Sequence, residues 1–139
     1  MKRNIWITET DSQRLGKLLD TLEEVPEKRD QPHVAELRAE LERAKTIKDV
    51  KKTPPDVVTM RSVVRLRNES TGNTLECRLV YPDEANAETS QISVLAPLGT
   101  ALLGERAGKT FTASLPKGDT KFTVEELVYQ PEAAGDYHL

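Results

Sequence analysis

Few side chains in this sequence could bind a transition metal or carry out nucleophilic catalysis. The only cysteine and the two histidines, Cys77, His33 and His138, are far apart and form no recognised zinc-ligand spacing. No serine occupies the centre of a Gly-x-Ser-x-Gly nucleophile elbow. We therefore predict that the chain has no catalytic residue, no metal site and no cofactor.

The glycines come close to a phosphate-binding pattern without completing it. The segment 104–110 has Gly104 and Gly108 before Lys109-Thr110, one residue fewer than a Walker A loop requires, and a strand pattern follows it instead of a helix. Gly99 and Gly104 have the correct separation, but Glu105 follows them and its charge would repel a phosphate. These glycines therefore indicate turns.

Carboxylates gather in a polar turn between two helical patterns. The acids Glu23, Glu24, Glu27 and Asp30 could hold a divalent cation, because hard cations prefer oxygen ligands. Lys28 and Arg29 lie among these acids, which favours an ordinary solvated turn over a metal site.

The helical patterns flank this turn. From Thr8 to Val25 leucines recur at helical spacing, with Thr8 as the predicted N-cap and Asp11 as an acid in the first turn. A second helix is predicted over 32–47, antiparallel to the first. Each apolar seam is shorter than two heptads, so the hairpin is expected to pack against another part of the chain.

The polar segment 48–56, which ends in Pro54-Pro55, is the predicted boundary between a hairpin domain (1–47) and a second domain (57–139). Beyond it the hydrophobic period changes from 3.6 to 2. Strands are predicted at 61–67, 75–81, 92–95, 110–115 and 121–129, a short helix within 96–104, and an irregular tail at 130–139. Glu125 beside Glu126 interrupts the alternation and predicts a bulge.

In this region the pattern predicts one set of buried residues and one set of exposed residues. The core candidates are Leu66, Leu79, Val94, Phe111, Phe122 and Val128. Four arginines, Arg61, Arg65, Arg67 and Arg78, are predicted to share an exposed sheet face, which either meets an acidic partner or stays solvated.

Composition excludes several classes of protein. The 139 residues, 37% hydrophobic and 31% charged, suffice for one ordinary core without a disulfide or metal, and Cys77 is expected to be a buried apolar residue. The net charge of −3 opposes direct nucleic-acid binding. Because no run of eighteen apolar residues or signal-peptide segment occurs, we expect a cytoplasmic protein that does not bind membranes.

The second domain resembles the carboxy-terminal domain of the Gre transcript-cleavage factors. The matching segments are 56–60, 91–97 and 101–104. A closer likeness is to a short-hairpin branch of that superfamily, the regulators of nucleoside diphosphate kinase, and it is carried by 79–82, 96–104 and 129–137. The resemblance covers nearly the whole chain and is weakest in the hairpin.

This resemblance implies an α+β fold, in which a short antiparallel helical hairpin precedes an FKBP-like antiparallel β domain with one short helix. In the Gre family the carboxy-terminal domain binds RNA polymerase at the rim of its secondary channel, and the hairpin carries two acids to the catalytic Mg²⁺. The rim contact maps to Leu95, Ala96, Pro97 and Leu98. Some Gre factors have more polar residues at the first two of these positions.

The length of the hairpin decides which function the resemblance predicts. The 15 residues from His33 to Ile47 span roughly 20 to 25 Å as a helix, which is shorter than a Gre hairpin. Glu24, Glu27 and Asp30 at its tip would stop outside the catalytic centre. The expected function is therefore that of a monomeric regulator that binds RNA polymerase and competes with Gre-type factors without stimulating transcript cleavage.

Three alternatives remain open at this point. The chain could be an active cleavage factor that delivers its tip acids to the Mg²⁺. It could be a prolyl isomerase by analogy of fold, although such pockets are usually lined by aromatic side chains and only 4% of its residues are aromatic. It could also control nucleoside diphosphate kinase or nucleotide pools, directly or through transcription.

Overall fold

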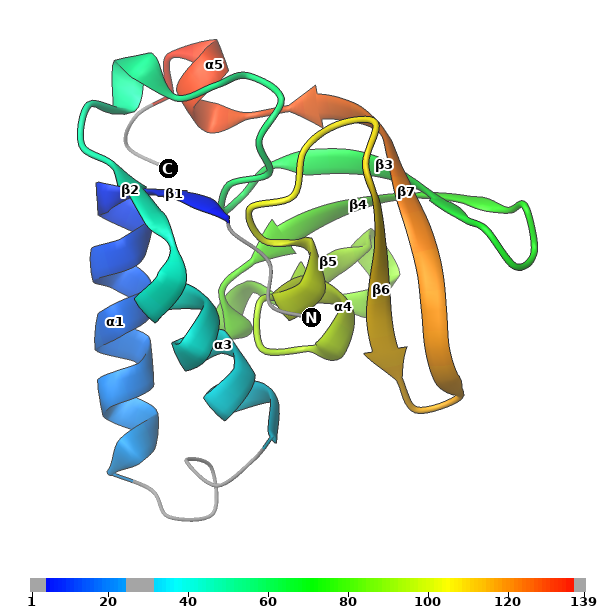
Figure 1. Cartoon of the computed structure of the whole chain (residues 1–139), viewed down its shortest axis with the longest axis horizontal. Coiled ribbons are helices and arrows are strands. Elements are labelled where there is room, and N and C mark those ends of the chain that lie inside the picture. Colours follow the sequence, from blue (N-terminus) through cyan, green and yellow to red (C-terminus); the bar gives the residue numbers. More distant parts are fainter. Residues whose placement is uncertain (1–4, 25–31, 137–139) are drawn as a thin grey trace.

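A helical hairpin precedes a five-stranded sheet in the computed structural model, which describes residues 5–24 and 32–136 (Figure 1). Helices α1 (Glu9–Glu23) and α3 (Pro32–Arg43) lie side by side along one flank of the sheet. The α+β class predicted from the sequence is confirmed. Within the described ranges, no helix is long and apolar enough to cross a membrane.

Helix α1 begins where the sequence predicts. The Thr8 hydroxyl accepts a hydrogen bond from the Asp11 backbone N–H at 3.1 Å, which satisfies one of the free donors at the helix start. Leu15 and Leu19 of α1 and Leu37 of α3 are buried in the same hydrophobic cluster as the sheet residues. The short hairpin is thus supported by the sheet, as its short apolar seams require.

The second helix ends earlier than predicted. Helix α3 stops at Arg43, and strand β2 (Lys45–Ile47) instead pairs in parallel with β1 (Trp6–Thr8). The Lys45 N–H donates to the Ile5 carbonyl at 2.9 Å. The predicted helix through residue 47 is therefore wrong, because backbone partners about forty residues away in the chain capture this segment. The resulting two-stranded ribbon ties together the two ends of the hairpin.

The five-stranded sheet has the strand order β5-β4-β3-β7-β6. Its strands are β3 (Val63–Asn68), β4 (Thr74–Val80), β5 (Gln91–Ser93), β6 (Thr110–Leu115) and β7 (Gly118–Tyr129). Only β5 pairs in parallel with its neighbour, β4; the other pairings are antiparallel. Helix α4 (Pro97–Leu102) contacts β6 and α3, so apolar residues of the hairpin, α4 and one sheet face form a common core.

Strand β7 contains two bulges opposite β3. Glu125 is the extra residue between the Arg65–Glu126 and Leu66–Val124 pairs, which confirms the predicted bulge. A second register shift leaves Val128 without a partner on β3, and its side chain is 42% exposed. The assignment of Val128 to the core is therefore wrong, whereas the other five core candidates are buried.

The irregular tail predicted for residues 130–139 is wrong for its described part, 130–136; residues 137–139 lie outside the described residues. Residues Pro131–Ala134 form helix α5, which Gly135 ends with φ = +83°. The buried Gln130 side chain donates to the carbonyls of Pro54 (2.8 Å) and Val57 (2.7 Å). Because these acceptors lie more than seventy residues away, the local sequence pattern did not indicate that this segment is ordered.

Candidate functional site

The predicted contact residues Leu95, Ala96, Pro97 and Leu98 form the turn from β5 into α4. The backbone N–H of Leu95 donates to the Ser93 hydroxyl at 3.1 Å, and that of Ala96 donates to the Ser93 carbonyl at 3.0 Å. Ser93 therefore fixes the backbone of this turn through both its hydroxyl and its carbonyl oxygen.

The other end of the turn is also fixed. The Thr100 hydroxyl donates to the Val94 carbonyl at 2.6 Å. Pro97 occupies the first turn of α4, where its missing N–H costs nothing. At Gly99 the backbone passes so close to Ser93 that an added Cβ would lie 2.0 Å from the Ser93 carbonyl oxygen. This turn therefore requires glycine at position 99.

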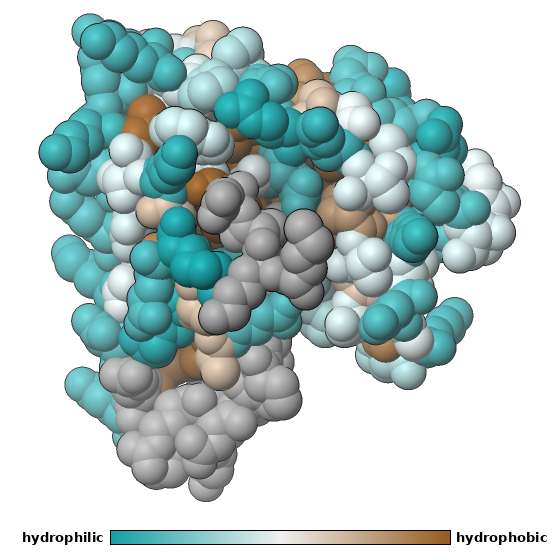
Figure 2. Space-filling view, in the orientation of Figure 1, coloured by the Kyte–Doolittle hydropathy of each residue, from teal (hydrophilic) through white to brown (hydrophobic). Residues whose placement is uncertain are grey.

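The turn presents a small apolar surface on a rigid frame. Pro97 is exposed, and Leu95 and Leu98 are half-buried, each with part of its side chain against the core. None of the four side chains can titrate or coordinate a metal. The surface is therefore suited to contact with another apolar surface and not to catalysis. On the face shown in Figure 2, apolar residues occur as small separate patches among hydrophilic ones.

One of the three predicted tip acids lies within the described residues. Glu24 is exposed directly after α1, whereas Glu27 and Asp30 lie outside the described residues, as does His138. In the parts of the chain that the structure describes, no three His, Cys, Asp or Glu side chains lie together as a metal site. Cys77 is buried, and burial raises the pKa of its thiol to about 12, consistent with a packing role.

Asp11 has a role that the sequence did not reveal. Its Oδ2 accepts a hydrogen bond from the Met60 backbone N–H at 3.0 Å, which joins the start of α1 to the segment before β3. The carboxyl is 1% exposed, and its Oδ1 has no hydrogen-bond partner among the described residues. Burial, with a smaller contribution from the nearby negative charge of Glu132, raises the pKa of Asp11 to about 7.

A second buried acid lies close to this contact. Glu132 of α5 accepts a hydrogen bond from the Thr59 hydroxyl at 2.6 Å, and Thr59 in turn lies 2.9 Å from the Ser62 hydroxyl. The segment 59–62 therefore donates hydrogen bonds to both the hairpin and α5. No local pattern indicates this network, because its members come from three separate segments.

The predicted arginine face is divided by the structure. The β3 arginines contact carboxylates: Arg65 contacts Glu126 (2.7 Å) and Glu76 (3.9 Å), and Arg67 contacts Glu69 (3.0 Å) and Glu125 (3.3 Å). Exposed pairs of this kind stabilise a fold little, but they neutralise the positive charge of the face.

The other two arginines differ from these. Arg61 lies in the turn before β3 with φ = +66° and forms an ion pair with Glu84 at 3.1 Å, so it does not belong to the face as predicted. Arg78 of β4 has its guanidinium 5.5 Å from the centre of the Tyr129 ring.

Comparison with known proteins assigns the class of protein. Residues 52–129 match the model of the carboxy-terminal region of the transcription elongation factors GreA/GreB, and residues 3–46 match that of the Rnk N-terminus. A solved structure described as prokaryotic transcription elongation factor GreA/GreB from Nitrosomonas europaea superimposes with a TM-score of 0.74 at 38% identity, covering 92% of this chain and 100% of that one. The chain therefore belongs to the GreA/GreB family.

Individual relatives define its place more closely. The regulator of nucleoside diphosphate kinase of Escherichia coli (strain K12) is 44% identical over 136 residues, which cover 97% of this chain and 96% of that protein. The transcription elongation factor GreA of Chlorobium phaeobacteroides is 34% identical over 96 residues, which are 68% of this chain but 60% of that protein. The resemblance found in the sequence is confirmed, and the chain is a Gre-like regulator.

Proposed function

We propose that this chain regulates transcription by binding RNA polymerase near its secondary channel through Leu95, Ala96, Pro97 and Leu98. The observation that carries the proposal is the rigid apolar turn, in which Pro97 is exposed and the backbone is held by Ser93 and Gly99. The turn lies within the segment that matches the GreA/GreB family, and a preformed turn loses little conformational entropy when it binds.

The second part of the proposal is that the chain does not stimulate transcript cleavage. Helix α1 has 15 residues and α3 has 12, so the helices are about 22 and 18 Å long. They lie along the sheet and share its core, which reduces their reach beyond the body of the protein. The Chlorobium GreA extends well beyond the segment it shares with this chain. The chain would occupy the channel entrance and exclude factors with longer hairpins.

Changing Pro97 to glutamate tests the docking turn. In the complex the glutamate charge would be buried against the polymerase, which is expected to weaken binding to core RNA polymerase at least ten-fold, about 1.4 kcal/mol. The fold should be kept, because an acid is favourable in the first turn of a helix. Binding of fluorescently labelled protein would be measured by anisotropy. The matched control is Pro116→Glu in the exposed turn between β6 and β7. Equal binding by the two variants would remove the turn from the proposed interface.

Backtracked elongation complexes test the proposal that the chain does not stimulate transcript cleavage. With Mg²⁺ and this chain alone, the transcripts are expected to keep their length over the time in which a GreA protein shortens them. Added in excess, the chain should slow shortening by GreA, because both would need the same entrance. Transcript shortening by the chain itself would contradict the proposal and establish it as a cleavage factor.

The remaining alternatives have less support. Phe111 and Phe122 stack with ring centres 5.9 Å apart, and both are buried, so they do not line an open pocket of the kind an isomerase would need. The relatives are named as a regulator and as elongation factors, which supports a non-enzymatic role. We propose that any effect on nucleoside diphosphate kinase acts through transcription.

A further inference from the structure

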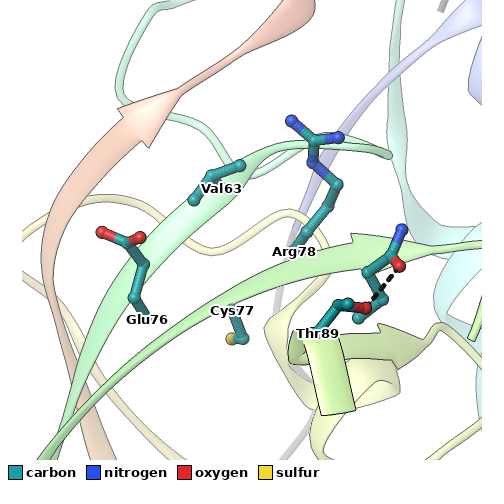
Figure 3. Close-up of a pocket in the computed structure, with 6 residues that line it drawn as sticks. Val63, Glu76, Cys77, Arg78 and Thr89 are labelled. Atoms are coloured by element: carbon teal, nitrogen blue, oxygen red, sulfur yellow. Dashed lines mark hydrogen bonds between the residues drawn. The ribbon is translucent and has the colours of Figure 1, made fainter. Parts of the chain in front are cut away.

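The outer face of the sheet, opposite the core, carries one row of side chains that differs from its neighbours. The strand register places Gln91 beside Arg78, Arg78 beside Val63, and Val63 beside Tyr129, so the row crosses β5, β4, β3 and β7. Glu76 and Arg78 project from one side of β4, and the buried Cys77 projects from the other (Figure 3).

The charge of Arg78 is not neutralised by carboxylates as the charges of the neighbouring arginines are. Arg65 and Arg67 each contact two carboxylates, whereas in the described part of the chain Arg78 contacts none. Glu76, which lies two residues away, is within 3.9 Å of Arg65. Of the three arginines on this face, Arg78 is therefore the one whose charge is available to pair with a carboxylate of another molecule.

The structure also holds Arg78 in place. Its guanidinium lies over the Tyr129 ring, and the Tyr129 hydroxyl donates to Asp136 Oδ2 at 2.5 Å. The Asp136 backbone N–H donates to the Pro131 carbonyl of α5 at 2.8 Å. The hydrogen bond from the Tyr129 hydroxyl to Asp136 also raises the pKa of Tyr129, so the hydroxyl stays protonated. With its guanidinium 5.5 Å from the centre of the Tyr129 ring, Arg78 can still donate two parallel hydrogen bonds to one carboxylate.

Gln91 supplies further donors at the same place. The Thr89 hydroxyl donates to Gln91 Oε1 at 2.7 Å, which turns the two amide hydrogens of Gln91 away from Thr89. Gln91, Thr89 and Arg78 line a cavity of about 370 Å³ together with Val63, Glu76 and Cys77 (Figure 3). The cavity thus combines a guanidinium that lies over the Tyr129 ring with an oriented amide.

We propose that Arg78 and Gln91 form a binding site for a glutamate or aspartate side chain in an extended segment of a partner protein. Bidentate acceptance from Arg78, with a third hydrogen bond from the Gln91 amide, would satisfy the carboxylate. A segment of protein fits better than a small free acid, because small-molecule sites are mostly apolar and enclosed. This inference does not depend on the proposed function, since neither residue belongs to the turn at 95–98.

Titration of the ¹⁵N-labelled full chain with an acetylated and amidated hexapeptide of alternating glutamate and valine tests the proposal by NMR. The Arg78 Nε–H and Gln91 amide signals are expected to shift first. Arg78→Gln should weaken binding at least ten-fold, whereas Arg65→Gln, with the same loss of charge on the same face, should change it less than two-fold.

Four results would overturn the proposal. They are the absence of shifts at millimolar peptide, equal weakening by the two variants, equal binding of a peptide with glutamine in place of glutamate, and equally tight binding of free glutamate. Equal weakening would indicate a general effect of charge, and tight binding of free glutamate would indicate a small-molecule site. The titration of the parent chain decides the matter even if Arg78→Gln fails to fold.

Discussion

Replacing Gly99 with alanine is expected to lower the free energy of unfolding by about 3 kcal/mol or more. The new Cβ would lie 2.0 Å from the Ser93 carbonyl oxygen and 2.9 Å from its carbonyl carbon. Both are backbone atoms, so the strain cannot be relieved by rotating a side chain. Either β5 must separate from α4 or the first turn of α4 must unwind, and both changes displace Leu95 and Leu98 from the core.

Urea denaturation followed by circular dichroism measures this loss. The matched control is Gly16→Ala in the middle of α1, where an added Cβ meets no atom within 4 Å. There, alanine is expected to stabilise the protein by about 1 kcal/mol, because glycine is a poor helix former. Opposite signs for the same chemical change would show that close packing at position 99 is responsible. A Gly99→Ala protein as stable as the parent would mean that the turn is not rigid.

Between about pH 4 and pH 7 the Asp11 carboxyl is expected to make the protein less stable as the pH rises. Its pKa is raised from 3.8 to about 7 in the folded chain, so in this window the folded state binds a proton that the unfolded state has lost. Stability is then full below the unfolded pKa and decreases with pH, by about 1.4 kcal/mol per unit and about 4 kcal/mol in total. Met60 and Arg14 oppose the shift, but burial outweighs them.

The variant Asp11→Asn isolates this contribution. Asparagine keeps an oxygen that can accept from the Met60 N–H, but it cannot ionise. In urea denaturation at pH 4.5, 5.5, 6.5 and 7.5, the variant is expected to gain stability relative to the parent as the pH rises. Asp20→Asn, an exposed position on the same helix, is the control and should follow the parent. Parallel curves for Asp11→Asn and the parent would show that the Asp11 carboxyl ionises normally.

The sequence indicated most of the fold because many of its signals act over a few residues. The cap at Thr8 marks the start of α1, the period-2 alternation marks β3 and β4, and Glu125 beside Glu126 marks a bulge. The order of its motifs also indicated the family, which the comparisons confirm. The turn at 95–98 came from that resemblance and not from the chemistry of its residues, and its role in binding stays a prediction.

Tertiary structure decided the features that depend on distant partners. Strand β2 replaced the end of a predicted helix because β1 supplies its hydrogen bonds. Gln130, just before α5, donates to the carbonyls of the distant residues Pro54 and Val57. Asp11 has a raised pKa because the packing of the fold around the start of α1 buries its carboxyl. Local sequence patterns report which side of an element is apolar. Desolvation and long-range hydrogen bonds depend on which segments meet in the fold, and short-range patterns do not contain that information.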